Sequence, residues 1–216
     1  MHHRSCDNAL MKRSSLWLLP FLLAVLVGGS FYFDRQAAKG DREINVYVTG
    51  GQRMAAGEEI YRRGLDKKPF TYPPFAAMPF VPFAKLPASW YASAWFLVNF
   101  LILIGVIRWL HSYASSAGTG RSPPRLWLFW ALTVVFGGRH VVSVFTNQSH
   151  DLIIAGLLAL VAASWCSNRR LRGAWAGLWA GLAAATKATP LIFLGLFGLR
   201  LHWVGIVSIL LVTIGA

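Results

Sequence analysis

Charged residues are scarce in this sequence. Of its 216 residues only 13% are Asp, Glu, Lys or Arg, while 56% are hydrophobic. A soluble domain of this size needs more charged side chains to cover its surface, and the apolar residues here are grouped into long runs. The composition excludes an ordinary soluble protein and predicts an all-α multispanning membrane protein.

Cysteine is scarce as well. Cys6 and Cys166 flank different apolar runs at no metal-binding or redox spacing, so we expect neither a disulfide nor a cysteine-based site. The sequence has no GxSxG, CxxC, HExxH or phosphate-binding loop. His140 and His150 have no third ligand at a suitable spacing, so the sequence predicts no metal centre and no resident cofactor.

Basic residues are in excess, with a formal net charge of +13. They do not form a stripe interleaved with exposed aromatics, so we expect no nucleic-acid partner. Instead they mark every second junction between apolar runs, at Lys12 and Arg13, Arg121 and Arg125, Arg169, Arg170 and Arg172, and Arg200. The positive-inside rule then predicts a multi-pass protein of the plasma (inner) membrane with a cytoplasmic N-terminus.

The apolar runs predict the helices. We expect an uncleaved first helix over residues 16–33, a second spanning helix over residues 88–110, and shorter helices over 126–136, 152–166, 174–190, 191–203 and 204–216. Residues 1–216 are interpreted as one membrane domain. The sequence ends inside an apolar run, which predicts an N-terminal fragment of a longer protein.

Residues 34–87 are predicted to form an extracytoplasmic loop. Its polar part, residues 34–71, carries six of the eight acidic residues and includes a short amphipathic helix followed by a Gly-rich break. Its second part, "YPPFAAMPFVPFAKLP", holds five of the ten prolines and is too broken for a spanning helix. We expect broken turns along the membrane interface, with Tyr72, Phe75, Phe80 and Phe83 facing lipid; a simple linker is the alternative.

Polar side chains gather on the face opposite the basic junctions. They are Asp41, Glu43 and Tyr47 in the first loop, Arg139, His140, Asn147, Gln148, His150 and Asp151 in a predicted loop over residues 137–151, and Lys187. Such groups suit a hydroxylated, anionic ligand, and ionisable side chains near membrane depth are functional candidates. The alternatives are that Lys187 snorkels or pairs with Asp151, and that Asp41 and Glu43 are solvated loop charges.

Three blocks in this order resemble glycosyltransferase family 87, whose members are membrane enzymes of the GT-C class. The blocks are "EINVYVTGGQRMAAGEEIY", "FTYPPFAAMPFVPFAKLP", and "TNQSHDLIIAGLLALVAASWCSNRRLRGAWAGLWAGLAAATKATPLIFL". They are similar to the family's acid-x-x-x-Tyr pattern, its Tyr-x-Pro-Pro segment, and its Gln-led helix followed by Lys-x-x-Pro.

The resemblance implies a GT-C-like helical bundle that moves a hexose, most often mannose, from a polyprenyl-phosphate donor to a lipid or glycan acceptor with inversion. It implies that Glu43, or else Asp41, is the general base, although the family usually has Asp at the position of Glu43. It makes Lys187 the candidate for the donor phosphate and leaves Tyr47, Tyr72, Arg139, His140 and Gln148 as substrate-binding candidates. His150 stands where the family commonly has Asn.

Two other functions fit parts of the sequence. Helices interrupted by Gly and Pro, with a buried Lys, also suit a transporter or lipid flippase. The abrupt end and the Glu at position 43 also suit a non-catalytic fragment of a glycosyltransferase.

Overall fold

A computed structural model describes residue 20 and residues 23–40, 42–62, 68–117, 124–167, 170–200 and 202–215. These residues form helices joined by turns, with no β-strand among them, which confirms the all-helical prediction. The labelled helices are α2 (Glu43–Ala56), α3 (Tyr91–Ala117), α4 (Pro124–Asn147), α5 (Asp151–Trp165), α6 (Arg172–Thr186), α7 (Phe193–Leu199) and α8 (Trp203–Gly215). An N-terminal helix precedes them over residues 23–37.

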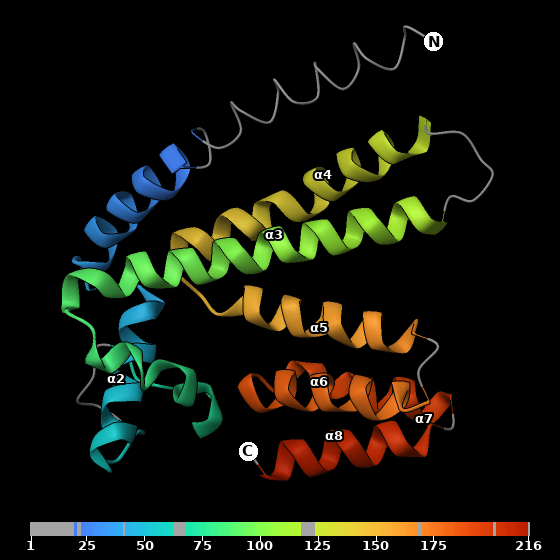
Figure 1. Ribbon diagram of the computed structural model, residues 1–216. Helices are drawn as coiled ribbons and strands as arrows, with labels where there is room; N and C mark the ends of the chain where they lie inside the picture. Colours follow the sequence, from blue (N-terminus) through green and yellow to red (C-terminus); the bar gives the residue numbers. More distant parts are fainter. Residues whose placement is uncertain are drawn as a thin grey trace, which may run out of the picture.

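The long helices lie roughly parallel, and α2 lies across one end of them (Figure 1). We call this the α2 end; it also holds the junction between α4 and α5 and the end of α6. At the opposite end, the linker end, α3 is followed by α4 and α5 by α6. Among the described residues, the basic α5–α6 and α7–α8 junctions, with Arg170 and Arg200, lie at the linker end, as predicted (Figure 1). The orientation of the two ends in a membrane stays a prediction.

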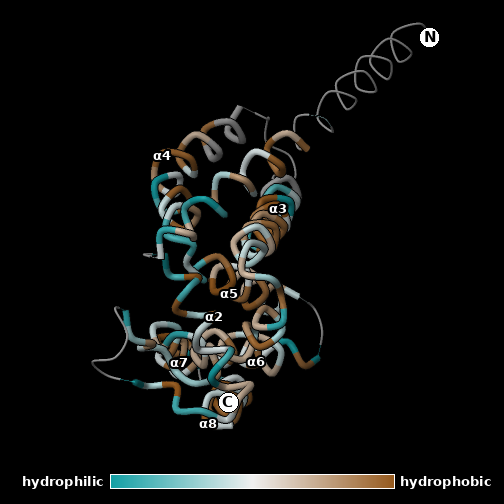
Figure 2. Tube along the Cα trace, turned by 90° about the vertical axis from the view of Figure 1, so that its left-hand side faces the viewer, coloured by the Kyte–Doolittle hydropathy of each residue, from teal (hydrophilic) through white to brown (hydrophobic). Residues whose placement is uncertain are grey.

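Among the described residues, one helix is long and apolar enough to cross a membrane, over Ala88–Tyr113. Shorter apolar helices cover Asp151–Trp165, Thr189–Leu199 and Trp203–Gly215. Viewed from the α2 end, α3 and α5 are largely hydrophobic (Figure 2). The structure is therefore compatible with a helical membrane protein, and a multispanning topology remains an expectation.

Helix α2 has the end signals of a stable helix. Glu43 lies in its first turn and Arg53 in its last, so both charges complement the helix dipole. Gly57 ends the helix with φ 68°, a left-handed conformation that favours glycine, and its N–H donates to the carbonyl oxygen of Met54 at 3.2 Å. The amphipathic helix expected in this segment is confirmed.

The proline-rich segment forms short 3₁₀ helices, η1 (Pro74–Phe80), η2 (Phe83–Lys85) and η3 (Ala88–Trp90), as the broken turns predict. It packs directly on α2 because Gly51 has no side chain: a Cβ there would lie 2.6 Å from the backbone carbon of Phe80. Phe80 is only 2% exposed and contacts the rings of Tyr47 and Trp95 at 4.9 and 4.7 Å. The expectation that Phe80 faces lipid is wrong, because α2 and α3 bury its ring.

Helices α6 and α8 pack through small residues. A Cβ on Gly177 would lie 2.5 Å from the carbonyl oxygen of Gly205, and one on Gly181 would lie 2.7 Å from Val212. Glycines four residues apart let two backbones approach closely, a common arrangement between helices in membranes. This contact fixes the lower layer of Figure 1, where α6 and α8 lie side by side.

The polar loop does not begin at Asp34, because the N-terminal helix continues through residue 37. One carboxylate oxygen of Asp34 accepts the backbone N–H of Ser93 at 3.0 Å, and the other accepts the Ser93 hydroxyl. Ser93 lies in the first turn of α3, whose N–H groups have no partner within the helix. Asp34 therefore caps α3 and ties it to the N-terminal helix.

The predicted loop over residues 137–151 is also wrong in most of its length. Helix α4 continues through Gly137 and Gly138 and ends at Asn147. Two glycines cost a helix only about 2 kcal/mol, and breaking it among apolar residues would leave backbone groups unpaired at a greater cost.

Candidate functional site

Tyr47 is the centre of a hydrogen-bonded group at the α2 end. Its side chain is fully buried, and its hydroxyl lies 2.5 Å from Oε2 of Glu43, one helical turn earlier on α2. The same hydroxyl lies 2.6 Å from Nδ1 of His150, which is 103 residues away in the sequence. Tyr47 therefore connects the acid of α2 to the junction between α4 and α5.

His150 is held tightly between aromatic rings. It is 2% exposed, and its ring meets those of Tyr47 and Tyr72 nearly edge-on, with centroids 4.9 and 4.7 Å apart. Its position just before α5, after the end of α4, brings it into contact with α2. Tyr72, from the proline-rich segment, thus joins the group as a packing partner.

The hydrogen bonds define the tautomer of His150. A carboxylate only accepts, so the Tyr47 hydroxyl donates to Glu43 and accepts from the Nδ1–H of His150. Nε2 is then a bare acceptor, buried and without a hydrogen-bond partner in the described part of the chain. Burial lowers the pKa of His150 to about 4, so the imidazole is neutral at physiological pH. Burial and the bond to Glu43 hold the pKa of Tyr47 far above its ordinary value, so the hydroxyl keeps its proton.

Lys187 and Asp151 form an ion pair beside this group. Nζ of Lys187 lies 3.0 Å from Oδ1 of Asp151, and the two side chains are 41% and 47% exposed. Burial opposes the charge of Lys187, but Asp151 outweighs it and raises the pKa of the ammonium, with a smaller contribution from the charge of Glu43. The pairing with Asp151, which the sequence left as an alternative to snorkelling, is present, and the Lys187 ammonium stays charged and half-exposed.

Gln148 occupies a structural position. Its backbone has φ 56°, unusual for a residue other than glycine, and its side chain is 3% exposed. Its side-chain Nε2 donates to the backbone carbonyl oxygen of Phe33, and its backbone carbonyl oxygen accepts Nε1–H of Trp95, both at 3.0 Å. Gln148 therefore joins the N-terminal helix to α3 at the α4–α5 turn, and its contact with a substrate stays a prediction.

Two other candidates are not brought into the group, and a third lies outside the described residues. Arg139 and His140 lie exposed on α4, about 10–12 Å along the helix from its end at Asn147. Asp41 lies outside the described residues. Of the cysteines, Cys166 is a free, exposed thiol and Cys6 lies outside the described residues as well.

The role of His150 was missed in the sequence. His150 was among the polar side chains of the candidate face and departs from the Asn common in the family, but no spacing rule connects positions 47 and 150. The group places an acid, Glu43, in a half-buried position near enough to Lys187 for its charge to raise the pKa of that ammonium. Such a pair can take a proton from a hydroxyl and hold a nearby anion.

Comparisons with known proteins identify the family of the chain. The family model described as Glycosyltransferase family 87 matches residues 70–216, which include His150, Asp151 and Lys187 but not α2. No solved structure matches the chain significantly.

Curated relatives come from mycobacteria. A polyprenol-phosphate-mannose-dependent alpha-(1-2)-phosphatidylinositol mannoside mannosyltransferase of Mycolicibacterium smegmatis is 34% identical over 175 residues, covering 73% of this chain and 38% of the relative. A protein of the same description from Mycobacterium tuberculosis H37Rv is 29% identical over 202 residues, covering 87% and 47%. A pentamannoside mannosyltransferase of M. tuberculosis CDC 1551 is 28% identical over 182 residues, covering 79% and 39%. The chain thus spans less than half the length of each of these relatives, yet the family model matches well over half of the chain. The chain belongs to glycosyltransferase family 87.

Proposed function

We propose that the whole protein transfers mannose from a polyprenyl-phosphate donor to a phosphatidylinositol mannoside or related glycolipid. The proposal rests on the family, on the printed activities of the relatives, and on one structural observation: Glu43 is held by Tyr47 next to the Lys187–Asp151 pair. The donor is a co-substrate, and the proposed step through Glu43 requires no resident cofactor.

In the proposed step Glu43 acts as general base. It takes the proton of an acceptor hydroxyl, whose oxygen forms a bond to the anomeric carbon of mannose. The bond between that carbon and the phosphate oxygen breaks, and its electron pair leaves with the polyprenyl phosphate, which inverts the anomeric centre. Lys187 stabilises the negative charge on the departing phosphate. Tyr47 and His150 act as positioning residues, because they orient the carboxylate without contacting substrate.

The proposed location in the membrane rests on the positions of the α2 end and the linker end. The α2 end would face the extracytoplasmic side of the plasma membrane, and the basic linker end the cytoplasm, as the positive-inside rule requires. Helix α2 crosses the direction of the long helices, an orientation suited to an amphipathic helix at the interface (Figure 1).

Substitution of the acids tests the proposal in the full-length protein. We expect Glu43→Gln to lower transfer from radiolabelled polyprenyl-phosphate mannose by about 10²–10⁴-fold, the usual contribution of a positioned base. Glu43→Asp should retain more activity than Glu43→Gln, and Asp41→Asn is the matched control for the neighbouring acid. The assignment to Glu43 is wrong if Glu43→Gln transfers mannose at the wild-type rate, and a loss of transfer in Asp41→Asn alone would assign the general base to Asp41.

A further inference from the structure

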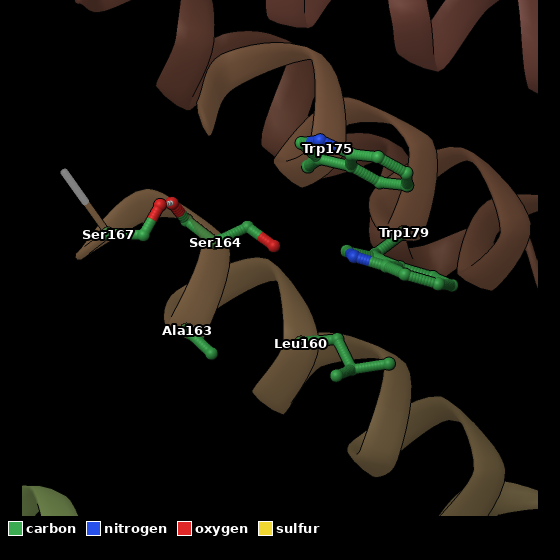
Figure 3. Close-up of a pocket in the computed structure, with 6 residues that line it drawn as sticks. All are labelled: Leu160, Ala163, Ser164, Ser167, Trp175 and Trp179. Atoms are coloured by element: carbon green, nitrogen blue, oxygen red, sulfur yellow. Dashed lines mark hydrogen bonds between the residues drawn. The ribbon is translucent and has the colours of Figure 1, made fainter. Parts of the chain in front are cut away.

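Two cavities share a wall on α5 toward the linker end. The first, of about 360 Å³, lies between α5 and α6 and is lined by Leu160, Ala163, Ser164, Ser167, Trp175 and Trp179 (Figure 3). The second, of about 370 Å³, lies between α3 and α5. Leu160 and Ala163 line both, so the two cavities are neighbours along one helix.

The first cavity combines aromatic and hydroxyl groups. Trp175 and Trp179 line it from α6, with ring centroids 6.2 Å apart, and the Ser164 hydroxyl points toward them from the last turn of α5 (Figure 3). Ser167, just after α5, donates its hydroxyl to the backbone carbonyl oxygen of Ser164 at 2.8 Å. Trp175 is 43% exposed. Tryptophan is enriched where a membrane's apolar core meets its headgroups, because its ring has an apolar body and a polar N–H.

The second cavity is lined by apolar side chains and glycines. It includes Ile102 and Gly105 on α3, and it extends along α5 from Ala163 to Ile153, about 15 Å of helix. A Cβ on Gly105 would meet no atom within 4 Å, so the space beside it is open. An extended apolar chain fits such a groove.

The chain between the two walls of the first cavity is basic. Arg170 and Arg172 lie exposed between Ser167 and Trp175, and residues 152–216 contain no Asp or Glu. The acidic side chains that the structure describes belong to elements of the α2 end, where Asp151 is already paired with Lys187. Arg170 and Arg172 thus have no acidic side chain of these helices to pair with and are available to an anion from outside.

We propose that these two cavities bind an anionic phospholipid. Its phosphate lies at Arg170 and Arg172, its glycerol region lies against the tryptophans and serines, and an acyl chain lies in the groove between α3 and α5. Basic pockets between membrane helices are known to hold acidic headgroups. This site is separate from the proposed donor site, because Arg172 and Lys187 are at opposite ends of α6, about 20 Å apart along the helix. The proposal does not depend on the proposed function.

Native mass spectrometry of the purified chain in a nonionic detergent tests the headgroup contact. We expect dioleoyl-phosphatidylglycerol to bind more tightly than dioleoyl-phosphatidylcholine, by about fivefold for each arginine. Arg170→Gln/Arg172→Gln should abolish the preference, while Lys39→Gln/Lys85→Gln, which removes two exposed charges at the α2 end, should keep it. Equal binding of the two lipids to the wild type, or an unchanged preference in the arginine variant, would overturn the proposal.

Gly105→Leu tests the acyl groove with little risk to folding, since its side chain enters open space. We expect it to weaken binding of dioleoyl-phosphatidylglycerol severalfold and to leave the short-chain dihexanoyl lipid unaffected. Gly195→Leu, on α7 and also in open space, is the control. If Gly105→Leu and Gly195→Leu change the binding of dioleoyl-phosphatidylglycerol equally, the acyl chain does not lie in the groove between α3 and α5. Stronger binding of farnesyl phosphate than of phosphatidylglycerol, lost in the arginine variant, would assign the site to a polyprenyl lipid and overturn the phospholipid assignment. A dimer that Trp175→Ala dissolves would likewise assign it to a second copy of the chain.

Discussion

The α2 end and the α6–α8 layer are held together in different ways. At the α2 end, segments distant in sequence meet through buried polar groups, as in the bonds from Tyr47 to Glu43 and His150. In the α6–α8 layer, glycines bring two backbones into direct contact. The first kind of contact depends on protonation and on single hydroxyl groups, and the second depends on the absence of side-chain atoms. We therefore expect the α2 end to lose stability when the pH falls or a hydroxyl is removed, and the α6–α8 layer when a side chain replaces a glycine.

The largest effect is expected in the α6–α8 layer. Gly177→Leu would place a Cβ 2.5 Å from the backbone oxygen of Gly205, which cannot turn aside as a side chain can. Overpacking of this kind typically costs 1–3 kcal/mol, and contact with backbone makes us expect at least about 3 kcal/mol. The thermal unfolding midpoint in detergent measures it, with Gly195→Leu as the control. If both variants unfold at the same temperature, the close contact does not stabilise the layer.

A pH-dependent loss of stability should mark the α2 end. The pKa of His150 is lowered from 6.5 to about 4 in the folded protein, so between these values the unfolded state binds the extra proton. The stability that His150 contributes is complete above pH 6.5 and falls by about 1.4 kcal/mol per pH unit below it, to a total of about 3 kcal/mol near pH 4.

Unfolding midpoints of the wild type and His150→Gln between pH 7 and pH 4 isolate this effect. The carboxylates titrate in both proteins, so only the difference between the two curves reports on His150. We expect the wild type to lose more stability than the variant as the pH falls. Parallel curves would show that His150 titrates normally and is not buried in the Tyr47 group.

Tyr47→Phe should have a smaller effect. The ring contacts remain, but Nδ1–H of His150 loses its acceptor, and an unpaired buried donor costs about 1–3 kcal/mol. Tyr113→Phe is the matched control, because Tyr113 is 50% exposed at the linker end. We expect a lower unfolding midpoint for Tyr47→Phe alone. Equal unfolding midpoints for the two variants would show that the hydroxyl of Tyr47 does not stabilise the α2 end.

The difference between local contacts within a helix and contacts between segments distant in sequence explains what the sequence could predict. Most helices were predictable because hydrophobic runs are local signals, and so was the amphipathic helix α2, where the expected Gly-rich break is the single Gly57. The glycines at 137 and 138 led to the wrong prediction of a loop, since a helix tolerates glycine when its surroundings penalise broken hydrogen bonds. Within the candidate site, the Lys187–Asp151 pair was open to inference from charge. The bond between Tyr47 and His150 was not, because it depends on how α2 docks under the α4–α5 junction.

The smallest effect on stability is expected at the ion pair. Asp151→Asn removes the partner of Lys187, but both side chains are nearly half-exposed, and such pairs contribute less than about 1 kcal/mol. Glu58→Gln, which breaks the exposed pair with Arg62, is the control, and both effects should shrink as salt is added. The prediction matters for function because an ion pair that adds little stability leaves its cation available to a phosphate. Lys187→Gln in the full-length protein should then reduce mannose transfer far more than it reduces the unfolding midpoint. If Lys187→Gln instead unfolds the α2 end, Lys187 is a structural residue and the donor phosphate must be bound by another cation.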